Sequence, residues 1–241
     1  MTSSAGLKNA AIMQRLNKRL VWVYETLRES YGPQYWWPAD TPFEVIVGAI
    51  LTQNTSWKNA EKAIDEIKRK GLMNPGALLK IRTEKLAKVI RPAGYHNLKS
   101  KRLKNFLRYY ADFCGLNFKT LKNKKVSTLR KELLSVNGIG PETADSILLY
   151  ACQKTVFVVD AYTRRIFFRQ NIISKDATYD IIQSIATSAL PGSRALFNEF
   201  HALIVKHGKD MCKKVPKCGI CPIKNGCGYD PTIDSLKNVT E

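Results

Sequence analysis

The stretch LLSVNGIGPETADSILLYA, from Leu133 to Ala151, joins two apolar helical patterns through a glycine turn. Gly138 and Gly140 flank Ile139, and no strand pattern precedes them. The sequence GxxxxGK[ST] of nucleotide-binding loops is absent. Between helices, the turn predicts a helix–hairpin–helix whose backbone N–H groups hold a DNA phosphate without reading sequence. The alternative is a turn that joins two helices for steric reasons only.

Helical periodicity dominates the rest of the chain. Apolar residues recur at three- and four-residue steps in 12–27 and 103–113, and the only strand-like run is TVFVVD at 155–160. Further helices are expected at 43–52, 56–70, 84–90, 127–136, 141–152, 161–170, 178–189 and 194–208. The fold class is therefore all-α, with about ten helices.

Charge favours a polyanionic partner. The chain of 241 residues has 39 Lys and Arg against 20 Asp and Glu, a formal net charge of +19. Nucleic acid is the first candidate partner and an anionic membrane surface the second, while a generic basic protein is the plain alternative. The N-terminal sequence has no signal-peptide pattern and no run long enough to span a membrane. We therefore expect a cytoplasmic, nucleoid-associated monomer without a membrane partner.

Four of the six cysteines stand close together near the C-terminal end. Their pattern is C-x5-C-x2-C-x5-C, over Cys212, Cys218, Cys221 and Cys227. Four thiolates within so short a segment suit a [4Fe–4S] cluster, whose irons each take one thiolate. Zinc is the alternative metal, although zinc ribbons use two separated C-x2-C pairs. Lysines in the same loop could face a phosphate backbone, or could be a solvated charge run.

Asp160 ends the apolar run VFVVD and precedes the helical pattern AYTRRIFFR. A carboxylate at this place is often a helix N-cap. It can also be held rigid for chemistry, so both roles are compatible.

Together, VNGIGPETA, VVDAYTRR and the cysteine loop resemble the endonuclease III superfamily of DNA glycosylases, from about residue 20 to 230. The resemblance implies two α domains with a DNA-binding cleft between them. We expect a six-helix barrel over 38–152, and a discontinuous cluster domain over 1–37 and 153–241. It also implies that Asp160 is catalytic and that the four cysteines hold the cluster. The first cysteine spacing is one residue shorter than the family's usual one.

Glu142 stands where members of the family that also cleave the strand carry a lysine. A carboxylate cannot form an imine with the sugar, so the resemblance implies a monofunctional glycosylase that leaves an abasic site. The carboxylate of Asp160 would stabilise positive charge on the sugar and orient or deprotonate water. Lys131 and Lys154 are the residues that could restore lyase activity.

The motifs WWPA, TQNT, RPAGYHN and GIG.E.AD.IL.YAC resemble most the 3-methyladenine DNA glycosylase III branch. The resemblance implies that Trp37 and Trp57 sandwich a flipped base, with the wall completed by Trp36 and Pro38. A cationic alkylated purine would gain about 2 kcal/mol over desolvated indole. Core packing is the alternative role for these tryptophans. Two departures limit the match: the branch's best-known form lacks the cysteine loop, and Leu203 replaces its pocket lysine. His201 is kept, and Glu142 and His201 are expected to line the pocket.

The same resemblance assigns contacts with double-stranded DNA that contains a damaged base. Gln53 would fill the gap left in the duplex, and Tyr95, helped by His96, would be the wedge. The remaining expected DNA contacts are Asn54, Asn97, Lys99, Asn137, Gly138, Ile139, Gly140 and Thr143. Two other functions stay open: a glycosylase for oxidised, deaminated or mismatched pyrimidines, and a non-catalytic DNA-binding iron–sulfur protein.

Overall fold

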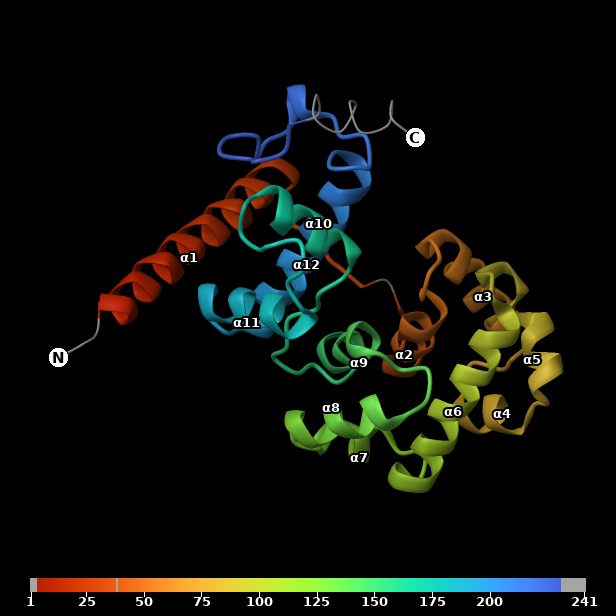
Figure 1. Cartoon of the computed structure of the whole chain (residues 1–241). Coiled ribbons are helices and arrows are strands. Elements are labelled where there is room, and N and C mark those ends of the chain that lie inside the picture. The colour runs from red at the N-terminus through yellow and green to blue at the C-terminus, as the bar shows by residue number, and fades with distance from the viewer. Residues whose placement is uncertain (1–3, 38, 231–241) are drawn as a thin grey trace. The chain divides into compact units, whose positions relative to one another are not determined.

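The computed structural model describes residues 4–37 and 39–230 (Figure 1). Every regular element in these residues is a helix, which confirms the all-α expectation. The chain divides into two compact units. The continuous unit is Trp37–Val156, and the discontinuous unit combines Met1–Trp36 with Phe157–Glu241. These boundaries differ from the expected 38 and 152, and they place Trp36 and Trp37 in different units.

The continuous unit holds most of the helices. They are α2 (Pro42–Leu51), α3 (Trp57–Arg69), α4 (Pro75–Lys80), α5 (Thr83–Val89), α6 (His96–Cys114), α7 (Phe118–Asn123), α8 (Val126–Ser135) and α9 (Pro141–Ser146). A 3-10 turn, η1 (Arg91–Ala93), precedes α6, and a π-helical turn, η2 (Ile147–Ala151), follows α9. The short helices α4 and α7 were not expected, because six residues give too little periodicity. The expected single helix 141–152 changes to π geometry after Ser146.

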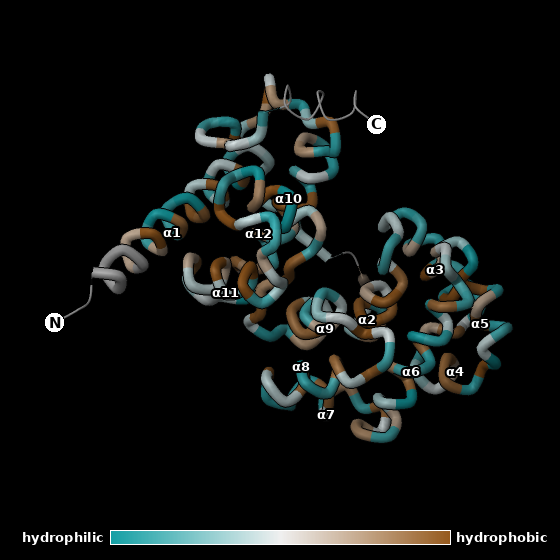
Figure 2. Tube along the Cα trace, viewed as in Figure 1, coloured by the Kyte–Doolittle hydropathy of each residue, from teal (hydrophilic) through white to brown (hydrophobic). Residues whose placement is uncertain are grey.

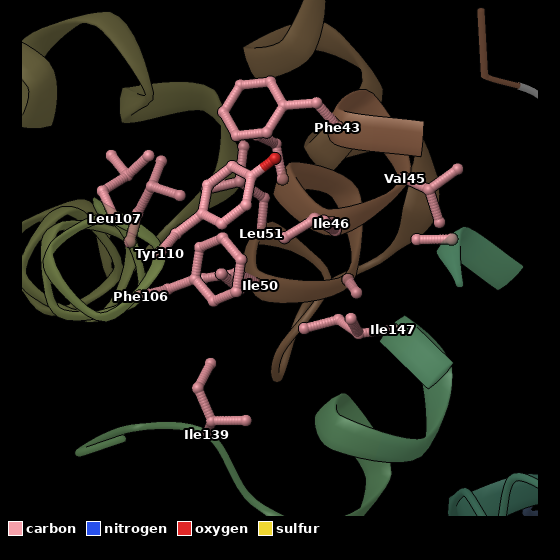
Figure 3. Close-up of a cluster of buried hydrophobic side chains, with 14 of the residues drawn as sticks. Phe43, Val45, Ile46, Ile50, Leu51, Phe106, Leu107, Tyr110, Ile139 and Ile147 are labelled. Atoms are coloured by element: carbon pink, nitrogen blue, oxygen red, sulfur yellow. The ribbon is translucent and has the colours of Figure 1, made fainter. Parts of the chain in front are cut away.

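Helix α2 is the centre of this unit. Its residues from Phe43 to Leu51 are all buried, and it contacts α3, α6, α9 and η2. Its tube is largely brown in Figure 2, whereas α6 shows both colours. In Figure 3, Ile46 and Ile50 of α2 face Phe106 and Tyr110 of α6. Thr41 caps the start of α2, since its hydroxyl accepts from the Glu44 backbone N–H at 3.2 Å.

The discontinuous unit contains four α-helices in its described residues. They are α1 (Ser4–Tyr31), α10 (Ala161–Arg169), α11 (Tyr179–Ala189) and α12 (Arg194–Asp210), followed by the 3-10 turn η3 (Cys218–Ile220). Helix α1 packs against α11 and α12, and α10 packs against α12. None of the described helices has the length and apolar composition that crossing a bilayer would require.

The segment before α10 is extended but forms no strand. Phe157 is fully buried and contacts the rings of Phe167, Phe197 and Phe200. The strand-like pattern at 155–160 is therefore core packing without a ladder. This packing fixes the entry to α10, where Asp160 stands.

Candidate functional site

The hairpin between α8 and α9 has the geometry that its glycines predict. Gly138 has φ of +96°, and an added Cβ would clash with the Cγ atom of Arg102. Gly140 is the N-cap of α9, and a Cβ there would meet nothing within 4 Å. A bidentate pair joins the two helices: Arg130 Nε and Nη2 donate to the Asp145 carboxylate at 2.8 and 3.1 Å. The turn is therefore rigid and its Gly140 face is open.

Two hairpin side chains expected at DNA point inward instead. Ile139 is 4 % exposed and belongs to the core, as its place in Figure 3 shows. Thr143 is also buried, and its hydroxyl accepts a hydrogen bond from Gln53 Nε2 at 2.9 Å. The Ile139 backbone N–H is engaged as well, because it donates to the Val136 carbonyl at 3.0 Å. Asn137 and Gly140 are exposed.

The turn after α2 also differs from expectation. The Gln53 amide donates to the Gly138 carbonyl at 3.0 Å and to Thr143, and its oxygen accepts from Arg102 Nη1 at 2.6 Å. In this arrangement Gln53 does not reach out to fill a gap in a duplex. Asn54, the next residue, is exposed with φ of +51°.

Residues of the loop before α6 divide between surface and core. Tyr95 is 69 % exposed with φ of +45°, which suits the expected wedge, and Asn97 is exposed. His96 is half-buried. Lys99 contradicts its expected role in DNA binding, because it is 1 % exposed and donates to the carbonyls of Leu51 and Ala93. Burial lowers the Lys99 pKa to about 8, and nearby Arg102 adds to the shift.

The expected aromatic sandwich is not open in this structure. The rings of Trp37 and Trp57 touch edge to face, with centroids 5.2 Å apart and planes at 83°. A base between two faces needs parallel rings about 7 Å apart, twice an ordinary contact distance. Trp37 instead packs against Tyr150, and their ring centroids are 4.8 Å apart. Both indoles lie over Gly48 of α2, where a Cβ would come 3.4 Å from Trp37 and 3.5 Å from Trp57.

The expected part of Trp36 and Pro38 in this wall stays a prediction. Trp36 belongs to the discontinuous unit, where Lys209 Nζ lies 5.5 Å from its ring centroid. Pro38 lies outside the described residues. Tyr150, which stands in the π-helical turn, was not predicted. Its sequence signal, an aromatic residue in the run after the hairpin, could have suggested a pocket position.

Asp160 is a helix cap and a poised carboxylate at the same time. Its Oδ1 accepts from the Thr163 backbone N–H at 2.7 Å and from the Thr163 hydroxyl at 2.9 Å. Its Oδ2 lies 3.5 Å from Nε2 of His201, and the Asp160 side chain is 12 % exposed. Burial acts to raise the Asp160 pKa, but the contacts with His201 and Thr163 prevail and hold the pKa below its usual value. The group is therefore an anion at neutral pH.

The two other expected pocket residues, His201 and Glu142, differ in their exposure to solvent. His201 is 5 % exposed and contacts Asp160, whereas Glu142 is exposed in the first turn of α9. Leu203, at the position of the branch's lysine, is fully buried. Its side chain therefore packs in the core of the discontinuous unit.

The four cysteine side chains line one pocket in the loop that follows α12. Arg169, Gln170 and His207 line it as well. Burial and the other three thiols raise the pKa of Cys221 to about 11. Arg169 Nη1 lies 3.3 Å from the Cys212 sulfur, and His207 Nε2 lies 3.7 Å from the Cys221 sulfur. Within 4–37 and 39–230, no group of three or more His, Cys, Asp or Glu side chains has metal-binding geometry.

Comparison with known proteins identifies the family. Residues 47–191 match the HhH-GPD superfamily base excision DNA repair protein. The chain belongs to the HhH-GPD superfamily. It is thus a base excision DNA repair protein, and its hairpin lies within the matched residues.

Individual relatives within the HhH-GPD superfamily differ in substrate. A Methanocaldococcus jannaschii protein, provisionally described as a DNA repair glycosylase, is 50 % identical over 85 % of this chain and 94 % of its own length. Endonuclease III of Sulfolobus acidocaldarius is 30 % identical over 81 % of this chain and 85 % of its own. The H. pylori 3-methyladenine DNA glycosylase, solved with 1,N6-ethenoadenine, has a TM-score of 0.67 and 30 % identity. It is matched over 82 % of this chain and 97 % of its own.

A solved complex of endonuclease III with DNA shares the fold. Its TM-score is 0.77 at 16 % identity, and the match covers 92 % of this chain and 98 % of the other. Sequence and structural comparison together confirm the superfamily that the hairpin, aspartate and cysteine motifs predict.

Proposed function

We propose that the chain is a monofunctional DNA N-glycosylase that flips out N-alkylated purines of the 3-methyladenine type, excises them and leaves an abasic site. The observation that carries the proposal is Asp160, a largely buried carboxylate with a lowered pKa in a chain of the HhH-GPD superfamily. The similarity to the H. pylori 3-methyladenine DNA glycosylase supports the substrate class.

Asp160 supplies negative charge for the reaction. Breaking an N-glycosidic bond builds positive charge on the sugar, as in other glycoside hydrolyses. A fixed carboxylate lowers this barrier because its hydrogen bonds are already in place before the charge develops. With Oδ1 engaged by Thr163, Oδ2 is the oxygen that faces the sugar or orients water. His201 beside Oδ2 holds the carboxylate in this orientation.

The residue at position 142 favours water as the nucleophile. Glu142 offers a carboxylate and no amine, so the residue cannot form a Schiff base with the sugar. Hydrolysis then ends at the abasic site, and strand cleavage is left to another enzyme. A base that is already cationic needs no acid, since it leaves as a neutral molecule.

The aromatic residues of the proposed base pocket favour a cationic base as the one that is excised. Trp37, Trp57 and Tyr150 form a contiguous cluster in the continuous unit, and all three are partly exposed. Because Trp37 and Trp57 meet edge to face, the flipped base is proposed to stack on the open part of this cluster. A positive charge over an indole face gains about 2 kcal/mol when desolvated, whereas a neutral base gains only stacking.

A pyrimidine glycosylase is the second candidate. The endonuclease III of S. acidocaldarius has the same 30 % identity as the H. pylori enzyme. A thymine/uracil-DNA glycosylase of Pyrobaculum aerophilum is 26 % identical over 79 % of the chain. Against it stands the aromatic character of the Trp37–Trp57–Tyr150 cluster, since pyrimidine discrimination relies mainly on hydrogen bonds.

The four thiols at the cysteine pocket favour a [4Fe–4S] cluster as its proposed occupant. Cys212, Cys218, Cys221 and Cys227 line it and supply the four thiolates that such a cluster needs. When bound, the cluster would supply structural support, because it would join four points of the loop. Arg169 would hold the loop around it, donating to the carbonyls of Lys213 and Lys214 at 2.7 and 3.2 Å.

The DNA partner is proposed to be a duplex that contains the damaged base. The net charge of +19 and the exposed hairpin backbone favour binding through phosphates, without sequence preference. Acting on chromosomal DNA, the protein would be a cytoplasmic, nucleoid-associated monomer.

The deciding experiment measures base release from three duplexes: alkylated DNA with 3-methyladenine, a uracil duplex and a thymine-glycol duplex. The proposal expects rapid release of 3-methyladenine and intact strands until hot alkali is added. Faster release of uracil or thymine glycol would favour the second candidate. No release from any duplex, with DNA still bound, would favour a non-catalytic DNA-binding protein.

A further inference from the structure

A polar network ties the turn after α2 to the hairpin. The Gln53 amide donates to the Gly138 carbonyl at 3.0 Å and to the Thr143 hydroxyl at 2.9 Å. Its oxygen accepts a charge-assisted hydrogen bond of 2.6 Å from Arg102 Nη1. Both N–H groups of the amide and its oxygen are thus engaged inside the continuous unit.

Gly138 makes this arrangement possible. A Cβ at this residue would clash with Cγ of Arg102, and the φ of +96° already disfavours other residues. The stem of Arg102 therefore runs across the hairpin backbone to reach Gln53. Only glycine leaves room for it.

Lys99 of α6 makes a second set of hydrogen bonds that stabilise the same turn. Lys99 Nζ donates at 2.8 Å to the carbonyl of Leu51, the last residue of α2, and at 2.7 Å to Ala93. It satisfies a helix-terminal carbonyl that has no partner in its own helix. Lys99 and Arg102 are one turn apart on α6, so a single helix holds both ends of the turn.

We propose that Arg102 and Gln53 form a latch that joins the turn after α2 to the hairpin, so that both meet DNA as one preformed surface. The inference rests on the proposed function, because it needs DNA as the partner. In the latched turn, Asn54 is the exposed residue that faces the duplex, while Gln53 works within the protein. Arg102 is a positioning residue that acts through Gln53. Preforming the surface lowers the ordering cost of binding.

Direct contact between Arg102 and a phosphate is the competing explanation, and salt dependence separates the two. Each phosphate contact contributes about one unit to the slope of log affinity against log salt. A residue that acts through Gln53 leaves this slope unchanged.

The test measures affinity for a duplex that carries a tetrahydrofuran abasic analogue, at several salt concentrations. The variants are Arg102→Met, Gln53→Met and the double variant. Arg108→Met is the matched control, because it removes one positive charge from an exposed position on the same helix. The latch predicts that each single variant weakens binding about tenfold, the loss of one charge-assisted hydrogen bond. The double variant should be no weaker than the weaker-binding single variant.

Two results would overturn the latch. One is additive losses in the double variant, and the other is a salt slope that falls by about one unit in Arg102→Met. Failure of the proposed function is recognised separately, since the wild-type protein would then not bind the duplex. Amide hydrogen exchange without DNA gives an independent reading. The latch predicts faster exchange at hairpin amides in Arg102→Met and Gln53→Met, and unchanged exchange in Arg108→Met; equal exchange in all three would also overturn it.

Discussion

Thr163 donates two hydrogen bonds to one oxygen of Asp160, from its backbone N–H at 2.7 Å and from its hydroxyl at 2.9 Å. The carboxylate thereby caps α10 and is fixed in one orientation. Its second oxygen lies 3.5 Å from Nε2 of His201. Capping needs only an acceptor oxygen, whereas the proposed chemistry needs a negative charge. The two roles can therefore be separated by substitution.

Asp160→Asn should abolish excision while the protein stays folded. The asparagine oxygen can still accept from Thr163, so the cap is kept and the melting temperature should fall less than in Asp160→Ala. Loss of the charge should lower the single-turnover rate of 3-methyladenine release by about 10²- to 10⁴-fold. Asp160→Ala is the comparison, because it removes the cap as well and should cost about 1 kcal/mol of stability. Retained activity in Asp160→Asn would exclude the carboxylate from catalysis.

We expect acid to lower the stability of the folded protein, and we do not expect a titration of Asp160 to show in the excision rate. The pKa of Asp160 in the folded protein lies below the ordinary value of 3.8. A lowered folded pKa means that its stabilising effect is complete well above 3.8 and is lost as the pH falls through the folded value. We expect single-turnover excision to show no acid limb from Asp160 between about pH 5 and 7. A limb near pH 6 that disappears in Asp160→Asn would contradict the lowered pKa.

The Trp37–Trp57–Tyr150 cluster should favour excision of cationic bases over neutral ones. Trp37 lies against both Trp57 and Tyr150, so Trp37→Leu removes the ring that both contact. Excision of a cationic base such as 7-methylguanine should fall by at least tenfold more than excision of neutral hypoxanthine, because the lost cation–π energy is about 2 kcal/mol. Trp22→Leu is the control, since that ring pairs with Arg19 in the discontinuous unit. Equal losses for both bases would assign Trp37 a packing role only.

Sequence periodicity predicts most of this fold, because apolar residues recur every three or four positions along each long helix and form one apolar face. The hairpin and the cap at Asp160 are also local, since glycine, proline and a carboxylate have conformational preferences of their own. The superfamily follows from these motifs. Short helices such as α4 were missed because they contain too few residues for a period to show.

The positions and partners of side chains are harder to predict from the sequence than the helices are. The resemblance assigns Lys99 to DNA, but its ammonium group donates to the carbonyls of Leu51 and Ala93. Gln53 was assigned to the duplex, and its amide is engaged by Arg102 and the hairpin. Leu51 is 48 residues away from Lys99 in the sequence, and Gln53 is 49 residues away from Arg102. Trp37 and Trp57 likewise both pack over Gly48, a contact that composition and spacing do not reveal.

The cysteine pocket should hold iron and sulfide. Purified without air, the protein should contain about four irons and four sulfides per chain, and Cys221→Ser should lose them. Cys114→Ser is the control, because that buried thiol lies in the continuous unit and does not line the cysteine pocket. One zinc per chain and no sulfide would assign the site to zinc. Metal retained in full by Cys221→Ser would remove Cys221 from the ligand set.

Glu142→Lys should convert the enzyme from hydrolysis towards strand cleavage. Glu142 is exposed in the first turn of α9, so a lysine there can be accommodated without repacking the core. Its amine could attack the sugar as base departs, and borohydride should then trap a covalent protein–DNA complex that the wild type does not form. Glu142→Gln is the matched control and should trap nothing, because an amide is not a nucleophile. Trapping by the wild type would show that another lysine reaches the sugar, with Lys131 and Lys154 the first to replace. If Glu142→Lys excises the base yet traps nothing, residue 142 does not face the sugar, and the argument for a monofunctional enzyme from this position fails.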